Sequence, residues 1–397
     1  MTGHLTILAP VRYPSLFNSP RKSRHHILRR RFLPMNYLSP KVEGVTVFPP
    51  SLLDRIDLIH GFNRIPLNPK PFVIGFESHL PRGFGIENSF FFTFMRNQLL
   101  NERCRAIVAI SEYAKRTFLA QHEGTSAYHE LAAKLVVRMP SVVLPKDPPA
   151  RKQTLPPIRL LFVGNHFARK GGCVALRLAQ LSLDAGLPLE IEIISKLEIG
   201  RVSWTDPLDE SFFDRYRPLL NLPNVRCWGE LPNQQVIEKI RQSHFLLLPT
   251  FGDSFGYSAI ESLINGTPVI ATRQCALPEF IRDGVNGIML DLPLNEKGEW
   301  IHLNSPDRGS KIFEKIHAQE VDQLAEETLR RLEEMLNSPT SFDAMALNAH
   351  ETAVQRFDSR LHDTFWDDLY ETAVLQPVEA YAPDGAHQAY PIDHFET

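Results

Sequence analysis

Short apolar runs alternate with polar and helix-like segments along almost the whole chain. In residues 1–150 the apolar runs are LTILAP, GVTVFP, IDLIHGF, PFVIGFE, AIVAIS and KLVVRMPSVVL, with helical spacing at 88–102 and 112–121. Further on, IRLLFVG, LEIEIIS, NVRCWGE, HFLLLP and PVIAT alternate with helical spacing at 171–185, 233–243, 257–265 and 278–282. Nearly continuous apolar strands with helices between them indicate parallel sheets buried on both faces. The pattern therefore predicts an α/β protein with two doubly wound, Rossmann-like domains that face each other across a cleft.

A proline-rich segment marks the expected boundary between the two domains. Residues 145–157, PKDPPARKQTLPP, contain five prolines among charged and polar residues, which is typical of a linker. We therefore expect one domain over 1–150, a second over 151–355, a helical segment over 356–375 and a loose tail over 376–397. Within the second part, the polar stretch 291–318 is typical of an inserted loop, and long helices are expected at 319–337 and about 342–375.

The composition is that of an ordinary globular protein, with 43% hydrophobic and 22% charged residues among 397. The longest apolar stretches, such as FFFTF at 90–94, fall far short of the roughly 18 residues that a membrane-spanning helix needs. The N-terminus lacks the basic flank and apolar length of a secretory signal, so we expect a cytoplasmic protein. The four cysteines have no C-x-x-C spacing and are expected to be small buried hydrophobes, without disulfide or metal.

Charge is distributed unevenly along the chain. Residues 1–150 hold 20 of the 43 Lys and Arg but only 10 of the 46 Asp and Glu. The segment RKSRHHILRRRF at 21–32 concentrates six of these basic residues with two histidines. It suits a solvated loop, an anionic membrane surface, or a phosphorylated or acidic acceptor. No aromatic-rich RNA motif accompanies it, so nucleic acid is not expected as a partner.

The stretch LLFVGNHFARKGG at 160–172 has the features of an anion site. A buried strand ends at Gly164, a loop carries Arg169 and Lys170, and two glycines open a helix. Free N–H groups at a helix start favour an anion, and the two cations add full positive charge. The pattern is neither the phosphate-binding loop of nucleoside triphosphatases nor the nicotinamide fingerprint. It therefore predicts a phosphate or diphosphate site, the alternative being a solvated Arg-Lys pair before a helix.

A second stretch, PTFGDSFGYSAIESLING at 249–266, has the same strand, turn and helix order. Asp253 lies in the glycine-containing turn, Ser258 near the helix start, and Glu261 about one turn inside the helix. Two carboxylates at different depths suit a ligand with hydroxyls at both ends and a phosphate between them, which is the shape of a nucleotide sugar. The alternative for either carboxylate is a helix-start or surface position without function.

Several motifs together resemble the C-terminal half of retaining glycosyltransferases of the GT-B fold, family 4. They are G-x5-K-G at 164–171, NVRCWGELPNQQV at 224–236, P-x3-[DE]-x-FG-x4-E at 249–261 and PEFIRDGVNG at 278–287. The resemblance is close over about 158–290 and looser in the N-terminal half. It implies an acceptor-side N-terminal domain, a nucleotide-sugar donor domain, and a final helix that crosses back to the N-terminal domain. It also implies transfer of a sugar to a hydroxyl, with the nucleotide sugar as donor substrate and neither cofactor nor metal.

The resemblance also implies roles for individual residues. Lys170 and Arg169 would bind the donor diphosphate, Asp253 would contact the transferred sugar, and Glu261 would hold the ribose hydroxyls. The complete set of expected donor-binding positions is Gly164, Asn165, Lys170, Ser254, Phe255, Gly256, Tyr257, Ser258 and Glu261. Two positions depart from the family pattern, since the family usually has Glu where Asp253 stands and Arg where Asn165 stands. Arg169 would then supply the missing positive charge.

Three polar residues of the N-terminal half are further candidates, and the function has alternatives. His79, after a buried strand, would hydrogen-bond the acceptor or donor sugar or shuttle a proton, unless it is structural. His60 follows another strand, and Ser111 is typical of a helix N-cap. The competing functions are a nucleotide-sugar epimerase, a phosphorylase of the same architecture, and a nucleotide-sugar-binding scaffold that is a catalytically weakened homologue.

Overall fold

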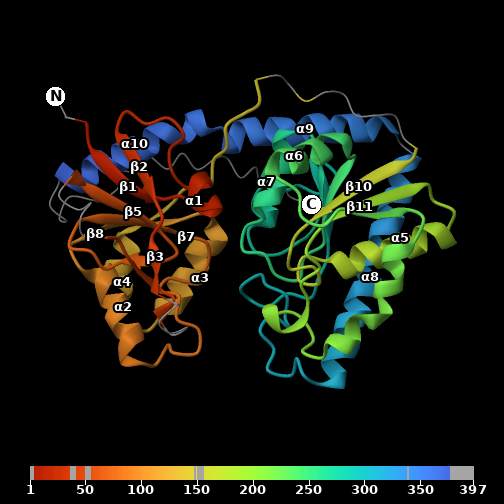
Figure 1. The fold of residues 1–397 in the computed structure, drawn as a ribbon, viewed down its shortest axis with the longest axis horizontal. Helices are drawn as coiled ribbons and strands as arrows, with labels where there is room; N and C mark the ends of the chain where they lie inside the picture. The colour runs from red at the N-terminus through yellow and green to blue at the C-terminus, as the bar shows by residue number, and fades with distance from the viewer. Residues whose placement is uncertain are drawn as a thin grey trace, which may run out of the picture.

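The N-terminal half is built on a six-stranded parallel sheet in the computed structural model, which describes residues 4–35, 42–49, 55–146, 149, 156–337 and 339–375. The strand order is β2-β1-β5-β7-β8-β9. The bounds are β1 (Thr6–Pro10), β2 (His26–Arg30), β5 (Leu58–Phe62), β7 (Phe72–Phe76), β8 (Cys104–Ala109) and β9 (Leu135–Val137). A small second sheet joins β3 (Leu33–Pro34), β4 (Val45–Val47) and β6 (Ile65–Pro66). Helices α1 (Tyr13–Phe17), α2 (Phe90–Leu100), α3 (Glu112–His122) and α4 (Tyr128–Ala133) complete this half (Figure 1).

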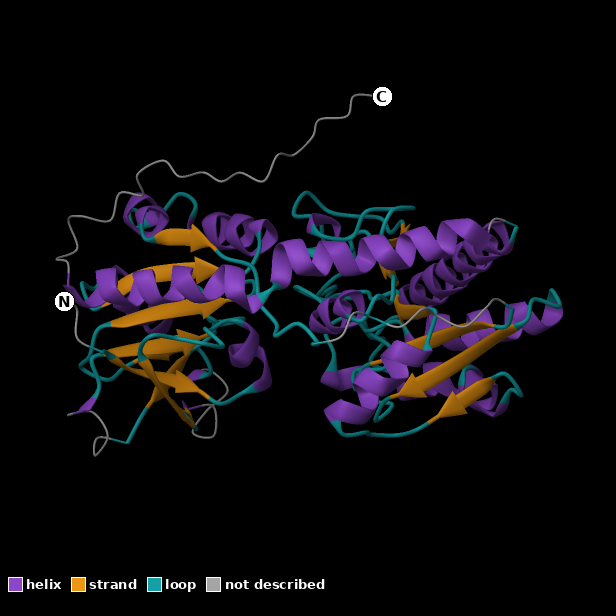
Figure 2. Ribbon diagram, turned by 90° about the horizontal axis from the view of Figure 1, so that it is seen from above, coloured by secondary structure: helices purple, strands orange, loops and turns teal. Residues whose placement is uncertain are grey.

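The C-terminal half repeats the plan with a second six-stranded parallel sheet, in the order β12-β11-β10-β13-β14-β15. The bounds are β10 (Ile158–Val163), β11 (Leu189–Ile194), β12 (Val225–Cys227), β13 (Phe245–Leu248), β14 (Val269–Thr272) and β15 (Gly287–Leu290). Its helices are α5 (Gly172–Asp184), α6 (Asn233–Gln242), α7 (Tyr257–Ile264), α8 (Lys311–Leu336) and α9 (Pro339–Phe357). Figure 2 shows the two sheets in separate halves of the molecule. The predicted fold class, two doubly wound parallel sheets, is confirmed.

Successive strand residues point to opposite faces of the N-terminal sheet, and both faces are covered. Leu8, Ile59 and Ile74 join a core with α2 and α3, whereas their neighbours Ile7, Leu58 and Val73 pack under α10 (Ser359–Leu375). Trp366 and Tyr370 of α10 are almost fully buried there. Two-sided burial is why these strands have no polar alternation in the sequence.

The two halves also share one hydrophobic core. The cluster that holds Phe76 and Phe118 of the N-terminal half continues into Phe255, Phe280 and Phe357 of the C-terminal half. The chain returns to the N-terminal half through α9 and α10, which Figure 1 shows along one edge of the molecule. Between these helices the backbone of Val142 pairs with Phe357 and Ser359, with N–H···O distances of 2.7 and 2.8 Å.

That pairing corrects the predicted single helix at 342–375. The backbone groups around Asp358 bond to Val142 instead of continuing the helical ladder, so the segment is two helices, α9 and α10. The predicted loop 291–318 is also too long, because α8 begins at Lys311, where the Ser310 hydroxyl accepts a hydrogen bond from the N–H of Phe313. The helix expected at 278–282 is a single 3-10 turn, Leu277–Glu279.

Two further expectations are corrected at the edges of the sheets. Cys227 is exposed, unlike the other three cysteines, because it lies on the edge strand β12. Residues 26–30 of the basic segment form strand β2 instead of a loop, because they pair with β1 at the edge of the N-terminal sheet. The tail 376–397 and part of the linker 145–157 lie outside the described residues.

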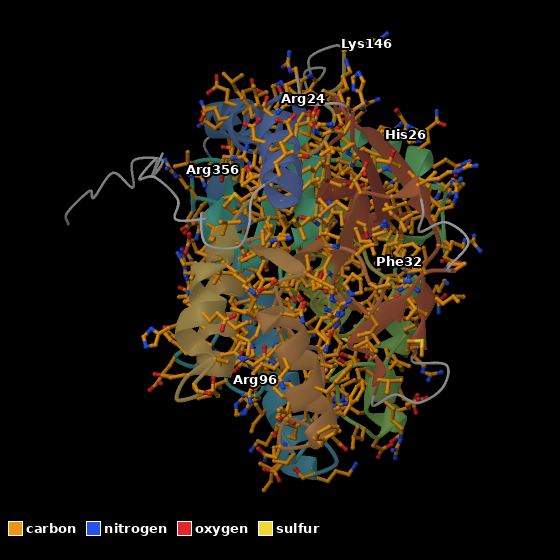
Figure 3. The ribbon with its side chains drawn as sticks, turned by 90° about the vertical axis from the view of Figure 1, so that its left-hand side faces the viewer. Arg24, His26, Phe32, Arg96, Lys146 and Arg356 are labelled. Carbon is orange, nitrogen blue, oxygen red and sulfur yellow. The ribbon has the colours of Figure 1, made fainter. Side chains whose placement is uncertain are left out.

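Hydrogen bonds and ion pairs join the basic segment to the acidic face of α10. The carboxylate of Asp363 accepts hydrogen bonds from the backbone N–H groups of Arg21 and Lys22, at 2.7 and 3.2 Å. Arg24 forms ion pairs with Asp368 and Glu371, at 2.6 and 2.7 Å, and Figure 3 shows it beside this helix. The uneven charge of the sequence therefore has an internal explanation in part, since basic and acidic segments far apart in the chain meet here.

Candidate functional site

The two stretches singled out in the sequence lie side by side at the switch point of the C-terminal sheet. Strand β10 pairs with β11 on one side and with β13 on the other. The loops that follow the adjacent strands β10 and β13 therefore start next to each other, and they lead to α5 and α7. Ligands of doubly wound sheets bind at such a point, beyond the carboxyl ends of the strands.

Both helices that leave these loops start at a glycine with left-handed backbone. Gly171 has φ of 92° and precedes α5, and Gly256 has φ of 84° and precedes α7. A Cβ on Gly171 would lie 2.2 Å from the carbonyl oxygen of Pro249, so only glycine fits between the two loops. No side chain of the described residues caps either helix, which leaves their first N–H groups available to an anion.

Lys170 and Asp253, one from each loop, form a half-buried ion pair. Burial lowers the pKa of Lys170 below its usual range, although the carboxylate of Asp253 opposes that shift. Burial alone would raise the pKa of Asp253, but the charges of Lys170 and Arg169 and a hydrogen bond from Phe255 N–H outweigh it and hold it low. The site therefore contains a positive and a negative group that neutralise each other at neutral pH.

Arg169 is buried beneath this pair and is held by the protein. Its Nη1 donates to the carbonyl oxygen of Gly252 at 2.5 Å, and its guanidinium lies 4.8 Å from the ring centroid of Trp204. It is close enough to lower the pKa of both Lys170 and Asp253. Arg169 thus adds positive potential to the site from a fixed position.

Glu261 lies within α7 and is 9% exposed. The side-chain amide of Asn233, at the start of α6, donates to its Oε1 at 3.2 Å. The Tyr13 hydroxyl, from the N-terminal half, lies close enough to Glu261 to lower the pKa of that carboxyl. Burial raises the pKa of Glu261, and Tyr13 and Asn233 only partly offset the shift. A carboxylate that faces an amide and a hydroxyl is suited to bind the hydroxyls of a ligand.

The remaining predicted donor positions surround the ion pair. A Cβ on Gly164 would lie 3.0 Å from Cγ of Lys170, so a side chain at position 164 would crowd the lysine. Asn165 is exposed, and its carbonyl accepts from the N–H of Glu198 at 3.0 Å. The other predicted positions form the turn and first residues of α7: Ser254, Phe255, Gly256, Tyr257 and Ser258, of which Phe255 and Gly256 are buried.

The N-terminal half contributes residues to this region that the sequence analysis did not identify. Besides Tyr13, Asn18 donates to the hydroxyl of Tyr257 at 2.8 Å, and the Phe17 ring centroid lies 5.0 Å from that of Tyr257. The carboxylate of Glu279 accepts the N–H groups of Glu112 and Tyr113 at the start of α3. A strand-end rule applied to the first strand could have indicated Tyr13, which is the third residue after the end of β1.

The three N-terminal candidates have different environments. His79 follows β7, and no hydrogen bond or ion pair among the described residues joins it to Lys170 or Asp253. Glu77, two residues earlier, lies close enough to Lys170 to raise its pKa. His60 is buried and lies 2.7 Å from the hydroxyl of Tyr370, and burial lowers its pKa to about 3. Ser111 caps α3 by accepting from the N–H of Ala114 at 2.9 Å, as predicted.

Two features are absent from the described part of the chain. No group of three or more His, Cys, Asp and Glu side chains there is arranged to hold a metal ion. None of the helices described combines the length and the apolar character that crossing a membrane requires.

Comparisons with known proteins agree with this geometry. Residues 157–297 match the family described as Glycosyl transferases group 1. Among curated relatives, the D-inositol 3-phosphate glycosyltransferase of Thermobifida fusca is 31% identical over 135 residues, which are 34% of this chain and 31% of the relative. An uncharacterized glycosyltransferase of Methanocaldococcus jannaschii is 34% identical over 101 residues, 25% of this chain and 26% of the relative. The chain thus spans about a third or less of the length of these curated relatives.

Two solved structures match over nearly the whole chain. The Anabaena protein HepE, in complex with UDP and glucose, has a TM-score of 0.56 at 14% identity, covering 92% of this chain and 99% of its own. A glycosyltransferase of Rickettsia africae has a TM-score of 0.57 at 13% identity, covering 94% and 100%. The chain therefore has the GT-B fold of these structures, and its residues 157–297 are similar to the family Glycosyl transferases group 1.

Proposed function

We propose that the protein transfers a sugar from a nucleoside-diphosphate sugar to an acceptor hydroxyl, with retention of the anomeric configuration. The observation that carries the proposal is the Lys170–Asp253 pair at the switch point, beside two uncapped helix starts, with Glu261 inside the second of these helices. HepE, which shares the fold, is described in complexes with UDP and with UDP-glucose. These neighbours support a nucleoside diphosphate as the leaving group.

In the proposed complex the donor spans the two loops. The ribose hydroxyls bind Glu261 in place of the Tyr13 hydroxyl, and the diphosphate lies against the starts of α5 and α7 with Lys170. Because the leaving diphosphate gains negative charge in the transition state, Lys170, the fixed Arg169 and the helix N–H groups stabilise that state more than the bound donor. Asp253 is then released from Lys170 and is free to accept a hydroxyl of the transferred sugar.

The bond changes follow from this arrangement. The bond between the anomeric carbon and the departing phosphate oxygen breaks, and a bond to the acceptor oxygen forms on the same face of the sugar. The acceptor proton passes to the departing phosphate oxygen, which is the base nearest to it. Retention requires no protein nucleophile in this scheme, which suits a site whose nearest carboxylate is paired with a lysine.

A thermal-shift screen tests the donor site. UDP, GDP, ADP and their sugar conjugates are added to the wild type and to Lys170→Ala and Glu261→Ala. A ligand at one hundred times its Kd stabilises the folded protein by about 2.7 kcal/mol, so the true donor raises the melting temperature clearly. Lys196→Ala, which breaks an exposed ion pair with Glu230, is the matched control and keeps the shift.

The competing functions give different results in the same experiments. A binding scaffold shows the nucleotide-dependent shift but releases no nucleoside diphosphate from any sugar conjugate with a broad panel of acceptors. An epimerase converts one nucleotide sugar into another without an acceptor. Loss of nucleotide release in Lys170→Ala, with binding of the free nucleoside retained, favours transfer over both.

Peripheral contact with an anionic membrane through the basic segment is a further part of the proposal. Lys22, Arg30 and Arg31 are exposed, although Arg24 is paired with α10. Each exposed cation near an anionic surface contributes about 1 kcal/mol. Sedimentation with phosphatidylserine vesicles at low salt tests this contact, and protein remaining entirely in the supernatant would contradict it.

A further inference from the structure

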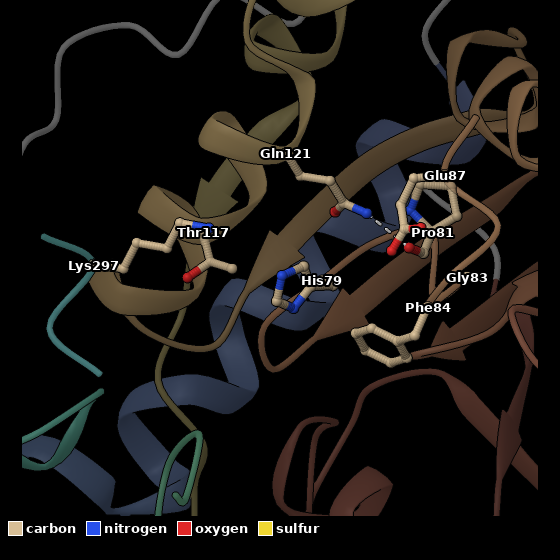
Figure 4. Close-up of a pocket in the computed structure, with 8 residues that line it drawn as sticks. All are labelled: His79, Pro81, Gly83, Phe84, Glu87, Thr117, Gln121 and Lys297. Carbon is tan, nitrogen blue, oxygen red and sulfur yellow. Dashed lines mark hydrogen bonds between the residues drawn. The ribbon is translucent and has the colours of Figure 1, made fainter. Parts of the chain in front are cut away.

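A cavity of about 220 Å³ lies where the two halves meet, on the N-terminal side of the donor site. Its walls are the loop that carries His79, Phe84 and Glu87, helix α3 with Thr117, and Lys297 from the C-terminal half. Figure 4 shows His79 between Thr117 and Lys297 on one side and Phe84 on the other. Pockets for drug-sized ligands measure roughly 300–1,000 Å³, so this cavity has room for about one ring of a small ligand.

Helix α3 forms one wall of the cavity through Thr117 and Gln121. Tyr113 lies one turn before Thr117, on the same face of the helix. The Gln121 amide accepts from the N–H of Leu80 and donates to the carbonyl of Pro81, both at 2.9 Å. The His79–Glu87 loop is thus fixed to α3 at its start, and the cavity is formed before any ligand enters.

A turn from the C-terminal half forms the opposite wall. Asn295 Oδ1 accepts from the N–H groups of Lys297 and Glu299, at 2.9 and 3.1 Å, which holds the turn closed. The Glu299 carboxylate accepts from the hydroxyl of Tyr113 on α3 at 2.7 Å. Lys297 therefore reaches the cavity only when the two halves have the arrangement seen here.

The lining combines an exposed aromatic ring with uncharged hydrogen-bonding groups. Phe84 lines the cavity and is 57% exposed, so part of its ring is open to a ligand. Burial, together with the charges of Lys297 and Arg82, lowers the pKa of His79, although Glu299 and Glu87 oppose the shift; its ring is neutral at neutral pH and can donate and accept. The Thr117 hydroxyl is buried and has no hydrogen-bond partner among the described residues.

We propose that this cavity binds an uncharged sugar or polyol ring of the acceptor, with Phe84 as the residue that selects it. A sugar ring has a C–H face that packs on an aromatic ring and a rim of hydroxyls for His79, Thr117 and Glu87. This inference rests on the proposed function, because it assigns the acceptor of the same reaction. The cavity lies beside the donor site. The residue after β7 is Glu77, whose charge raises the pKa of Lys170, and His79 of the cavity follows two residues later.

The charges around the cavity disfavour a phosphorylated acceptor. Lys297 is the single cation among the residues that line it, and the carboxylate of Glu87 also belongs to that lining. Arg82, next to the cavity, lies 3.8 Å from Glu77 and 4.0 Å from Glu43, so its charge is partly neutralised. Phosphate recognition normally uses several converging cations, whereas this arrangement suits a neutral ring.

The test uses the full chain with the donor found in the thermal-shift screen. Glucose, galactose, N-acetylglucosamine and inositol are compared with glucose 6-phosphate and inositol 1-phosphate, by release of nucleoside diphosphate and by saturation-transfer NMR. We expect one or more neutral probes to accelerate release. Phe84→Ala should raise the KM for that acceptor at least tenfold and leave acceptor-independent donor hydrolysis within twofold. The matched control is Phe90→Ala, whose ring is 87% exposed at the start of α2, and it should match the wild type.

Each outcome decides the inference separately from the proposed function. Stronger acceleration by the phosphorylated probes than by the neutral ones, or a wild-type KM in Phe84→Ala, would overturn the assignment of the cavity. Donor hydrolysis without NMR contact or acceleration by any neutral probe would also overturn it while leaving the donor site intact. Neutral-sugar binding that Phe84→Ala removes, in a protein that never cleaves a donor, would support the cavity and contradict glycosyl transfer.

Discussion

Replacing Lys170 with alanine tests the proposed donor site most sharply, because the lysine pairs with Asp253 in the structure and with a different group in the proposed complex. Its ammonium group now bonds the carboxylate of Asp253. In the complex it would bond the donor diphosphate, so Lys170→Ala should weaken diphosphate binding and leave recognition of the nucleoside intact.

The size of the effect follows from the chemistry of the contact. A hydrogen bond to a charged group contributes about 1.5–3 kcal/mol net, which corresponds to about 10- to 150-fold in Kd. The loss should lie in the lower part of that range, because Lys170 must first leave Asp253 and because Arg169 keeps its charge nearby. We therefore expect Lys170→Ala to raise the Kd of the nucleoside diphosphate by about 10- to 50-fold.

A second variant separates the two partners of the lysine. Asp253→Asn removes the charge that competes for Lys170, so the free nucleoside diphosphate should bind a few-fold more tightly, while turnover of the sugar donor falls. Combining the two substitutions gives a coupling free energy between Lys170 and Asp253. The double variant should bind the diphosphate as weakly as Lys170→Ala, since the benefit of Asp253→Asn depends on the lysine.

Calorimetric titration with the nucleoside diphosphate and with the bare nucleoside measures both quantities. The bare nucleoside should bind Lys170→Ala within about twofold of the wild type, since it lacks the phosphate groups. Lys196→Ala should leave both ligands unaffected. An unchanged Kd for the diphosphate in Lys170→Ala would refute the assignment of Lys170, as would an equal loss for diphosphate and nucleoside.

Three further predictions concern pH and stability. Burial raises the pKa of Glu261, so this carboxylate begins to protonate at a pH above its ordinary pKa of about 4.3. Nucleotide affinity, measured by titration calorimetry, should therefore fall from pH 7 to pH 5 in the wild type. It should not fall in Glu261→Gln. Tyr113→Phe removes a donor from the buried Glu299 carboxylate and should cost about 1–3 kcal/mol in the free energy of unfolding by urea. Trp366→Ala empties a site that is 1% exposed and should cost about 3–5 kcal/mol, whereas Arg24→Ala, with its side chain 45% exposed, should cost less than about 1 kcal/mol; equal losses would contradict this ranking.

The strand-end rule explains why the closeness of Lys170 and Asp253 could be predicted from sequence. The loops after 158–163 and 245–248 follow buried strands, and parallel strands bring their carboxyl ends to one edge. The rule places Lys170 and Asp253 near each other without any knowledge of their rotamers. It does not say that they form an ion pair in the unliganded protein, because that depends on a few ångströms of side-chain position.

Contacts between the halves could not be predicted in the same way. The contact of Tyr13 with Glu261 and the hydrogen bond of Tyr113 to Glu299 join residues 248 and 186 positions apart. No local pattern encodes such pairs. The i, i+4 spacing of Tyr113, Thr117 and Gln121 was visible, but it marks a helix face without saying what lies opposite. Only the packing of the two domains shows that a cavity lies there.

The partner of the basic segment could not be predicted from sequence either. Its six cations were evident, and so were Asp363, Asp367 and Glu371 at helical spacing near the C-terminus. Sequence charge alone could not show that Arg24 pairs with Asp368 and Glu371 while Asp363 accepts backbone N–H groups, because that requires α10 to return to the N-terminal sheet. The same basic sequence pattern is expected whether its partner is an acidic helix of the same chain or an external anionic surface.

The central claim, that this protein transfers a sugar with retention, is tested most directly by following the anomeric signals of donor and product by NMR during turnover. With an α-linked nucleotide-sugar donor and a neutral saccharide acceptor, the account predicts an α-linked product that forms in step with nucleoside diphosphate, and neither appears with Lys170→Ala. A β-linked product, or donor that stays intact with every acceptor while still binding at Glu261, would contradict it.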